Sequence, residues 1–394
     1  MEMKPGYKHT VVGVIPEDWS LKQITDFATT VASGKSHVIS EFGDYPVFGS
    51  TGIIGSCFKS DHSGTAVLIA RVGANAGKLT VVSGEYGVTD NTIIVRIDES
   101  LDHGFFWRQL ESRRLNSMVF GSGQPLITGT QIKSIRLPIP PTKAEQEAIA
   151  GALSDADALI ESLEQLLAKK RQIKQGTMQE LFTGKKRLPG FPAPWETKRL
   201  GDFGSTFGGL TGKSKRDFDH GPAQYITFMN IMSNVVIDCQ AFARVDVKHT
   251  ETQNRVLNGD IFFNGSSETP EEVGMCAVLT ENVQDVYLNS FCFGFRFRER
   301  SPVDGLYLAY YFRSREGREL LKSLAQGATR YNLSKTALLK LCFPLPSYKE
   351  QIAIATILSD MDAEIAVLET KLAKARQIKQ GMMQELLTGR IRLV

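Results

Sequence analysis

Apolar residues recur at alternating steps of three and four along two long stretches of the chain, a spacing that places them on one face of an α-helix. The first stripe consists of Ile149, Leu153, Ala156, Ile160, Leu163 and Leu167, and the second of Ile354, Leu358, Met361, Ile365, Leu368 and Leu372. Each stretch runs for about 38 residues, which at about 1.5 Å a residue makes a helix of roughly 55 Å. Because such a stripe needs a partner, we expect the two helices to pack on each other.

The two predicted helices are copies of one sequence. Residues 145–188 align with residues 350–393 at a constant offset of 205, without a gap, and 30 of the 44 positions are identical. Each copy closes with a glycine, Gly184 or Gly389, which suits helix termination. Each is preceded by a proline-containing strand end, because proline interrupts a strand ladder and is tolerated at a helix start.

The remaining sequence forms two blocks that resemble each other more weakly, with their segments in the same order. Each block opens with a Trp-containing segment, PEDWSLKQITDF or APWETKRLGDF, and continues with β-branched runs broken by glycine-rich loops. Strands are predicted within residues 66–82, 88–97, 260–279 and 287–297, and aromatic helices within 105–115 and 306–320. Residues 121–140 align on 327–346 without a gap.

These patterns predict an α+β chain with two globular α/β domains separated by two long antiparallel coiled-coil helices, related by a pseudo-two-fold axis. The first domain is expected in residues 1–142 and the first spacer helix in 143–187. The second domain is expected in 188–347 and the second spacer helix in 348–394. A two-headed binding protein of this symmetry matches duplex DNA, whose major groove presents equivalent surfaces about 34 Å apart along the axis.

Composition narrows the class of protein but does not identify a ligand. The chain has 394 residues, of which 42% are hydrophobic and 23% charged, and its net charge is +3. These values are typical of a globular protein, and any basic surface must be local. No run approaches a membrane span and the first twenty residues lack a signal-peptide pattern, so we expect a cytoplasmic location. The five cysteines lack a CxxC pair, and we expect buried thiols.

Motifs for catalysis and cofactor binding are missing from the sequence. Two GKS tripeptides, at Gly34 and Gly212, lack the glycine that a phosphate-binding loop carries five residues earlier, where Thr29 and Phe207 stand. There is no dinucleotide or S-adenosylmethionine fingerprint, no Asn-Pro-Pro-aromatic signature, no HExxH and no G-x-S-x-G. The acidic pairs Asp155/Asp157 and Asp360/Asp362 lie two positions apart on the helices, so a solvated helix surface is favoured over a metal site. We expect no catalytic residue, no metal and no bound cofactor.

The order of domains and helices resembles the specificity subunit of type I restriction-modification systems over essentially the whole chain. The phrases IPEDW, ARVGANAGK, VTDNT, GSGQPLITG and the endings RQIKQG and MQELLTG are in the style of that family. The resemblance implies that each domain binds one half of a split target in double-stranded DNA. It also implies that the helices fix the spacer and dock two methyltransferase subunits, which carry S-adenosylmethionine, while a separate motor-nuclease subunit uses ATP and Mg²⁺. Helix residues expected to contact the partner are Gln172, Gln175, Met178, Leu181, Gln377, Gln380, Met383 and Leu386.

Loops between strands can project the donors and acceptors that read base edges, and the Lys, Arg and Ser side chains that hold phosphates. Candidates in the first domain are Lys35, Ser36, Arg71, Asn75, Lys78, Ser122 and Gln124. Candidates in the second are Lys213, Lys215, Arg216, Ser266, Ser267, Thr329, Arg330, Tyr331 and Asn332. Arg330 aligns with Gln124, which suggests equivalent positions tuned to different bases.

Several features keep more than one interpretation. The aromatic run of Tyr307, Tyr310, Tyr311 and Phe312 has helical spacing, which favours core packing over a stacking platform for bases. The basic residues Lys169, Lys170, Arg171 and Lys174, with Lys374, Arg376 and Lys379 in the second copy, fit contacts to spacer phosphates and a solubilising surface equally well. Rival functions are a scaffold that binds no DNA, a specificity-like protein of another defence system, and a nuclease.

Overall fold

The computed structural model describes residues 5–37, 42–120 and 125–393, and the chain divides into two units. Unit 1 comprises Met1–Gln165 together with Glu369–Val394, and unit 2 comprises Leu166–Leu368. Each unit contains strands, short helices and parts of both long helices.

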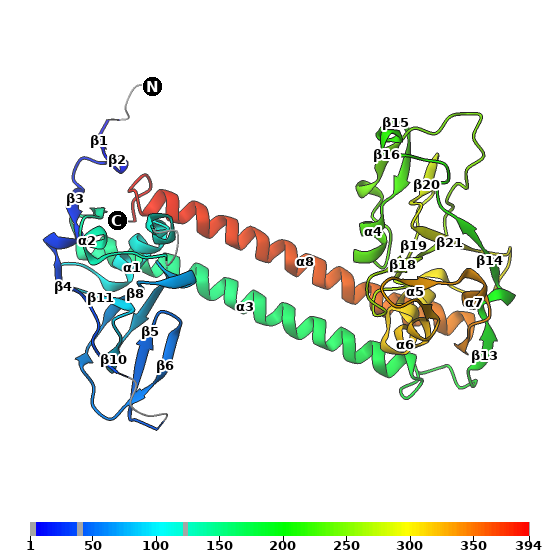
Figure 1. Cartoon of the computed structure of the whole chain (residues 1–394), viewed down its shortest axis with the longest axis horizontal. Helices are drawn as coiled ribbons and strands as arrows, with labels where there is room; N and C mark the ends of the chain where they lie inside the picture. The colour runs from blue at the N-terminus through cyan, green and yellow to red at the C-terminus, as the bar shows by residue number, and fades with distance from the viewer. Residues whose placement is uncertain (1–4, 38–41, 121–124, 394) are drawn as a thin grey trace. The chain divides into compact units, whose positions relative to one another are not determined.

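Unit 1 is built on an antiparallel sheet with the strand order β4-β11-β8-β9. Its strands are β4 (Ala28–Ser33), β11 (Thr92–Ile97), β8 (Ala66–Ala70) and β9 (Leu79–Val82). Side chains of β11 point alternately to its two faces and so contribute to two hydrophobic cores. Ile93 and Val95 face α1 (His103–Ser112), and Ile94 faces a second sheet. That sheet has the order β6-β5-β10-β7. Its strands β5, β6 and β10 are labelled in Figure 1. Its strands are β6 (Gly52–Cys57), β5 (Tyr45–Gly49), β10 (Glu85–Val88) and β7 (His62–Ser63).

Shorter elements close unit 1 around this sheet. The hairpin of β1 (Tyr7–Thr10) and β2 (Gly13–Pro16) leads to β3 (Ser20–Gln23), which pairs with β12 (Arg136–Ile139). Helix α1 begins where the Asp102 carboxylate accepts the Phe105 amide, and α2 (Gly129–Lys133) begins at a capping box between Thr128 and Gln131.

Unit 2 repeats the main sheet with the order β14-β21-β17-β19. Its strands are β14 (Gly204–Gly208), β21 (Cys292–Phe297), β17 (Ile261–Asn264) and β19 (Cys276–Val278). Beside it lie a sheet of β16 (Ala243–Val245), β15 (Phe218–Ile226) and β20 (Val286–Leu288), and the pair β13 (Glu196–Arg199) and β24 (Cys342–Leu345). A three-stranded sheet joins β18 (Ser266–Ser267), β23 (Tyr331–Leu333) and β22 (Ala325–Gln326), and the short helices are α4 (Phe228–Ser233) and α7 (Lys335–Leu339).

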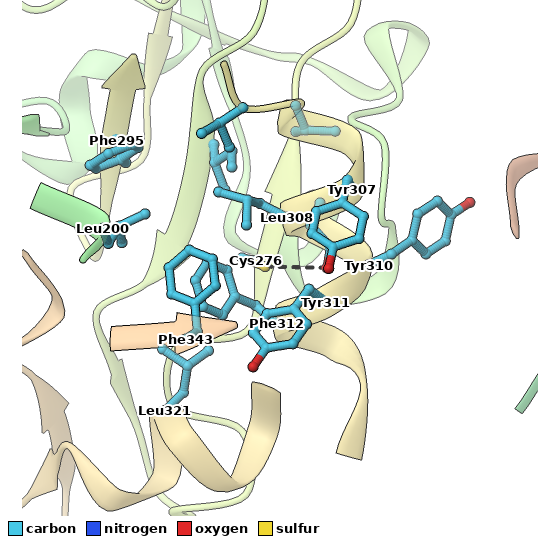
Figure 2. Packing of buried hydrophobic residues seen from close by; sticks show 14 of the residues in the cluster. Leu200, Cys276, Phe295, Tyr307, Leu308, Tyr310, Tyr311, Phe312, Leu321 and Phe343 are labelled. Atoms are coloured by element: carbon cyan, nitrogen blue, oxygen red, sulfur yellow. Dashed lines mark hydrogen bonds between the residues drawn. The ribbon is translucent and has the colours of Figure 1, made fainter. Parts of the chain in front are cut away.

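The aromatic helix predicted within residues 306–320 is two helices, α5 (Gly305–Arg313) and α6 (Arg315–Ser323). Ser314 ends the first and caps the second, because its amide bonds back to Tyr310 and Tyr311 while its hydroxyl accepts the Gly317 amide. The prediction of core packing is confirmed, since Tyr307, Tyr310, Tyr311 and Phe312 are at most 1% exposed. Figure 2 shows Tyr311 and Phe312 beside Phe343, and Tyr310 extending away from them.

The two long helices predicted from the repeat are present as α3 (Lys143–Phe182, 40 residues) and α8 (Tyr348–Leu386, 39 residues). The residues of both apolar stripes are buried or half-buried, as the spacing predicts. Gly184 and Gly389 follow the last turns with φ values of 66° and 70°, the left-handed conformation that terminates helices.

Ion pairs join α3 to α8 within each unit. In unit 1, Lys379 pairs with Asp157 at 2.6 Å and Arg376 with Glu164 at 2.6 Å. In unit 2, Lys170 pairs with Glu364 at 2.6 Å and Lys174 pairs with Asp362. Four members of the predicted basic cluster are therefore bound to carboxylates of the other helix, a role that neither interpretation of the cluster anticipated.

Asp157 and Asp362, expected on a solvated surface, also anchor each domain to its helices. In unit 1 Asp157 bonds to Arg108 of α1 at 2.6 Å, and in unit 2 Asp362 accepts the Tyr310 hydroxyl of α5 at 2.7 Å. Burial alone would raise the pKa of the Asp157 carboxyl, but the hydrogen bonds and charges of Lys379 and Arg108 hold that pKa below its usual range. The side chains of Asp157 and Asp362 are 37% and 36% exposed, so they are only partly solvated, because each also faces a domain helix.

The Glu-Gln pair that begins each helix copy is buried and holds distant segments together. Glu145 binds Arg392, and Glu350 binds Arg187 at 2.8 Å, so the glutamate of one copy meets the arginine that ends the other copy. Gln146 and Gln351 accept the amides of Asp102 and Asp304 at 2.8 and 2.9 Å, the residues that cap α1 and α5. These contacts explain why both polar residues recur in the repeat.

The cysteine prediction holds for three of the five residues. Cys57, Cys276 and Cys292 are buried, Cys239 is half-buried and Cys342 is exposed, and all five are free thiols. Cys342 begins β24 with its side chain on the outer face, while the next residue, Phe343, points into the core. The expectation of burial was therefore wrong for Cys342.

Candidate nucleic-acid interface

The same backbone frame carries a cluster of loops in each unit. The amide of Arg71 donates to the carbonyl of Asn91 at 2.9 Å, and the amide of Gly265 donates to that of Phe291 at 3.1 Å. The carbonyls of Arg71 and Gly265 in turn accept the amides of Ile127 and Leu333, at 2.9 and 3.0 Å. Positions 71 and 265, 91 and 291, and 127 and 333 are therefore equivalent, and different side chains stand on one frame.

In unit 2 this frame surrounds a cavity of about 520 Å³. Three residues predicted from the sequence, Ser266, Arg330 and Asn332, line it together, because β18 pairs with β23 and sets Ser266 opposite Asn332. Arg330 and Asn332 are exposed, and Ser266 is half-buried. The cavity thus combines a guanidinium, an amide and a hydroxyl, which are groups that bind base edges and phosphates.

The equivalent cavity of unit 1 has a volume of about 490 Å³ and is lined by Gly34–His37 and Thr89–Asn91, with Ile54. The predicted residue Lys35 is exposed here. Arg71 lies at the adjoining strand end and donates to the Ser33 hydroxyl and the Asp90 carbonyl, each at 3.4 Å. Ser36 is only 5% exposed and accepts the Val88 amide at 2.8 Å, so its hydroxyl holds the loop and does not face solvent.

Two further predicted residues of unit 1 belong to a separate hollow of about 360 Å³. Asn75 and Lys78 line it together with Arg114, Asn116 and Trp107. Lys78 and Arg114 are exposed, so the hollow carries two cations at its edge. The candidates Ser122 and Gln124 lie outside the described residues.

The remaining candidates of unit 2 do not line the cavity. Ser267 is 7% exposed and donates to Glu272 at 2.9 Å, Tyr331 is half-buried, and Thr329 is exposed on the loop before β23. Lys215 and Arg216 are exposed on a turn at residues 215–217. Lys213 is 5% exposed, and its ammonium bonds to Glu251 at 2.6 Å and to the Asp246 carbonyl at 2.5 Å. These contacts favour a structural role for Lys213 over a phosphate contact.

Lys213→Met is expected to destabilise unit 2 in a pH-dependent way. Hydrogen bonds from Lys213, and then from Gln253 and the Lys248 amide, lower the pKa of Glu251 from 4.5 to about 2. A lowered carboxyl pKa contributes stability that is full above pH 4.5 and is lost as the pH falls toward 2. The gap in unfolding midpoint between wild type and variant should therefore narrow from pH 7 to pH 3 in thermal unfolding. An equal gap at both values would contradict the assignment, and the exposed Lys215→Met serves as control.

The two GKS tripeptides follow the first strand of the main sheet in their units, but they are not structurally equivalent. In unit 1 the amide of Ser36, which follows β4, donates to the Val88 carbonyl of β10 at 2.8 Å. In unit 2 the amide of Leu210, which follows β14, makes the matching bond to the Leu288 carbonyl of β20 at 2.8 Å. Ser36 of the first GKS therefore corresponds to Leu210, which precedes the second GKS. Gly212 therefore lies beyond the frame, and the repetition of GKS is a coincidence of sequence.

Sequence reasoning missed the apolar and cationic residues that complete the unit 2 cavity. Phe291, Lys335 and Thr211 line it, and Phe291 is 60% exposed. The ammonium of Lys335 lies 5.6 Å from the ring centre of Phe293. No local motif marks these residues, but alignment of Phe291 with Asn91 through the strands that follow them would have indicated the position. The cavity wall also holds Cys292, whose burial raises the pKa of its thiol to about 12, so this thiol is neutral.

The helix residues expected to contact a partner divide into exposed and buried groups. Gln172, Gln175, Gln377 and Gln380 are exposed, and Met178 and Met383 are half-buried. Leu181 and Leu386 are each 4% exposed and pack in the cores of their units, so they are not on the surface. Gln380 and Met383 line a groove of about 480 Å³ with Val12, Arg113 and Arg114.

Metal-holding clusters and membrane-spanning helices are both absent from the described part of the chain. No group of three or more His, Cys, Asp or Glu residues there is placed to hold a metal ion. Nor is any helix among these residues long and apolar enough to cross a membrane.

The chain belongs to a family of DNA-recognition proteins. The family model described as the type I restriction modification DNA specificity domain matches it twice, at residues 16–174 and 192–377. These matches cover most of the sequence, so the chain is a member of this family and serves DNA sequence recognition in a type I restriction-modification system.

Individual relatives match along nearly their whole length. The type I restriction enzyme MjaVIII specificity subunit of Methanocaldococcus jannaschii is 24% identical, over 96% of this chain and 94% of the relative. The putative MjaX specificity subunit of the same organism is 22% identical, over 98% and 97%. The crystal structure of the S subunit from M. genitalium has the same fold, with a TM-score of 0.61 and 17% identity over 98% of this chain and 99% of that one.

Proposed function

We propose that each unit reads one half of a bipartite target in duplex DNA and that the chain itself performs no catalytic step. The observation that carries this proposal is the repeated loop frame, which presents different side chains at equivalent positions. Arg71 stands where unit 2 has Gly265, and Asn91 where it has Phe291. Two binding surfaces that share a backbone frame but carry different side chains suit two half-sites of different base sequence.

We further propose that α3 and α8 form an antiparallel coiled coil with pseudo-two-fold symmetry and thereby fix the spacer between the half-sites. The ion pairs support this arrangement. In unit 1 Asp157 pairs with Lys379 and Glu164 with Arg376. In unit 2 Lys170 pairs with Glu364 and Lys174 with Asp362. Within each unit, residue numbers therefore rise along one helix while those of their partners fall along the other, as in an antiparallel pair. Pairs of this kind set the orientation and register of helices.

The helices are also proposed to dock two methyltransferase subunits, one for each copy of the RQIKQG-MQEL sequence. The exposed glutamines Gln172, Gln175, Gln377 and Gln380, with the half-buried Met178 and Met383, would supply the contacts. A solved chain that covers 96% of this one, with a TM-score of 0.56, is described under complex assembly and conformational transition of the type I R-M system. In such a cytoplasmic complex the methyltransferase would hold S-adenosylmethionine, and the motor-nuclease subunit ATP and Mg²⁺.

Arg330→Ala is expected to weaken binding of the specific target and to relax only the half-site read by unit 2. The side chain is exposed at the mouth of the cavity, where a guanidinium can donate two hydrogen bonds to one guanine, worth about 1–3 kcal/mol. The expected loss of affinity is roughly 5- to 150-fold. The measurement is a binding titration with the methyltransferase complex, together with mapping of methylated bases across a genome that carries the variant.

The matched control is Arg244→Ala, which removes another exposed arginine of unit 2, from β16 and outside the cavity. It should leave the methylated sequence unchanged. If Arg330→Ala lowers affinity equally for all sequences, Arg330 contacts phosphate and is not part of the readout. If the wild-type complex shows a single undivided target, the bipartite proposal itself fails.

A further inference from the structure

Phe291 is an exposed aromatic residue on a rigid turn. Its side chain is 60% exposed, yet its backbone is fixed on both sides. The Phe291 amide donates to the Asn289 side chain at 2.9 Å, and its carbonyl accepts the Gly265 amide at 3.1 Å. An apolar ring held in water by a fixed turn gains free energy when a ligand covers it, and little side-chain entropy is lost because a phenylalanine has only two rotatable bonds.

The surroundings of this ring indicate what covers it. Arg330, Asn332 and Lys335 line the same cavity, so the ligand has acceptor groups and negative charge close to an apolar group. Gly209 and Gly265 form part of the wall, and backbone atoms lie too near for larger side chains, since a Cβ on Gly209 would be 2.1 Å from the Asn289 carbonyl oxygen. At these glycines the wall beside the Phe291 ring is therefore backbone without side chains, and the edge of a base pair can approach there.

We propose that Phe291 reads a thymine in the half-site of unit 2 by packing its ring on the C5 methyl group. Bases in an intact duplex expose only their edges, and the thymine methyl is the apolar group that the major groove displays. At the equivalent position unit 1 carries the exposed Asn91, whose amide suits the paired donor and acceptor of adenine. Position 91/291 is thus a specificity-determining position on the shared frame. This inference rests on the proposed reading of one half-site by unit 2.

The test uses the complex of the full chain with its methyltransferase, after its target has been mapped. Each thymine of the half-site assigned to unit 2 is replaced in turn by deoxyuridine, which lacks only the methyl group. With the wild-type complex, deoxyuridine at one thymine position should weaken binding roughly four-fold, the value expected for one buried methyl group. With Phe291→Ala or Phe291→Asn, deoxyuridine at that position should no longer change the affinity. With Phe291→Leu, part of the four-fold effect should remain.

Controls and contrary outcomes separate this inference from the function beneath it. Met229→Ala removes a side chain of unit 2 that is 63% exposed and lies outside the cavity, and it should keep the full deoxyuridine response. If deoxyuridine acts equally in wild type and Phe291→Ala, the ring does not read the methyl group. If Phe291→Ala loses affinity while no deoxyuridine matters, the ring instead inserts between base pairs, and the inference is again overturned. If no half-site maps to unit 2, the proposed function fails.

Discussion

Arg313→Met is expected to lower the free energy of unfolding of unit 2 by about 4 kcal/mol, the sum for four part-buried carbonyl groups that lose their donor. The guanidinium donates to the carbonyl of Cys276 in β19 at 2.6 Å. It also donates to three carbonyls in and after α4, those of Ile231, Met232 and Asn234, at 2.5, 3.1 and 2.6 Å. Methionine fills much of the same volume but leaves these acceptors without a donor. It also removes the cation that stabilises the C-terminal end of α4.

Urea denaturation would measure this loss of unfolding free energy. Hydrogen exchange of peptides from unit 2 would show that the loss belongs to this unit. The matched control is Arg315→Met, two residues further along, because Arg315 is exposed and its removal should change stability by less than about 0.5 kcal/mol. Burial lowers the pKa of Arg313. Even so, an arginine stays charged at neutral pH. A loss below about 1 kcal/mol for Arg313→Met would mean that water replaces the guanidinium at the carbonyls.

The long helices and the core strands could be predicted because their signals are local and periodic. The apolar stripe from Ile149 to Leu167 identifies the buried face of the helix even when its partner is unknown. A glycine, Gly184 or Gly389, marks the C-terminal end of each long helix. The repeat then doubles the signal. The break at Ser314 was missed because a serine within an aromatic run is compatible with a continuing helix. Only its hydrogen bonds to both neighbouring helices, α5 and α6, identify it as a cap.

The candidate site could be predicted only in part, because its members meet through strand pairing and not through spacing along the chain. Ser266, Arg330 and Asn332 were identified as loop residues, and the pairing of β18 with β23 brings them together. Lys213 was assigned by its charge alone, while its half-buried partner Glu251 lies 38 positions away. Phe291 was not identified because an exposed phenylalanine cannot be distinguished from a core residue before the strand register is known.

Gly34→Ala is expected to destabilise unit 1 by about 3 kcal/mol, at the upper end of the range for overpacking a fixed site. A Cβ at this position would lie 2.0 Å from the carbonyl oxygen of Val88 and 2.6 Å from that of Thr89. Both are backbone atoms, and the Gly34 amide is bonded to Thr92 at 3.0 Å, so neither side can move without breaking the start of β11. Because Lys35 follows directly, the variant should also lose affinity for the half-site of unit 1.

The comparison with two other glycines decides whether the frame or the GKS motif sets this cost. Gly209 faces the Asn289 carbonyl oxygen as Gly34 faces that of Val88, with 2.1 Å for a Cβ, so Gly209→Ala should destabilise unit 2 by a similar amount. Gly212, the GKS glycine of unit 2, has open space around it and a φ of 69°, so Gly212→Ala should cost only about 1 kcal/mol. Chemical unfolding of the three variants gives the order. If Gly34 and Gly212 have equal effects and Gly209 has none, the GKS tripeptides are equivalent after all, and the alignment of the two cavities must be shifted.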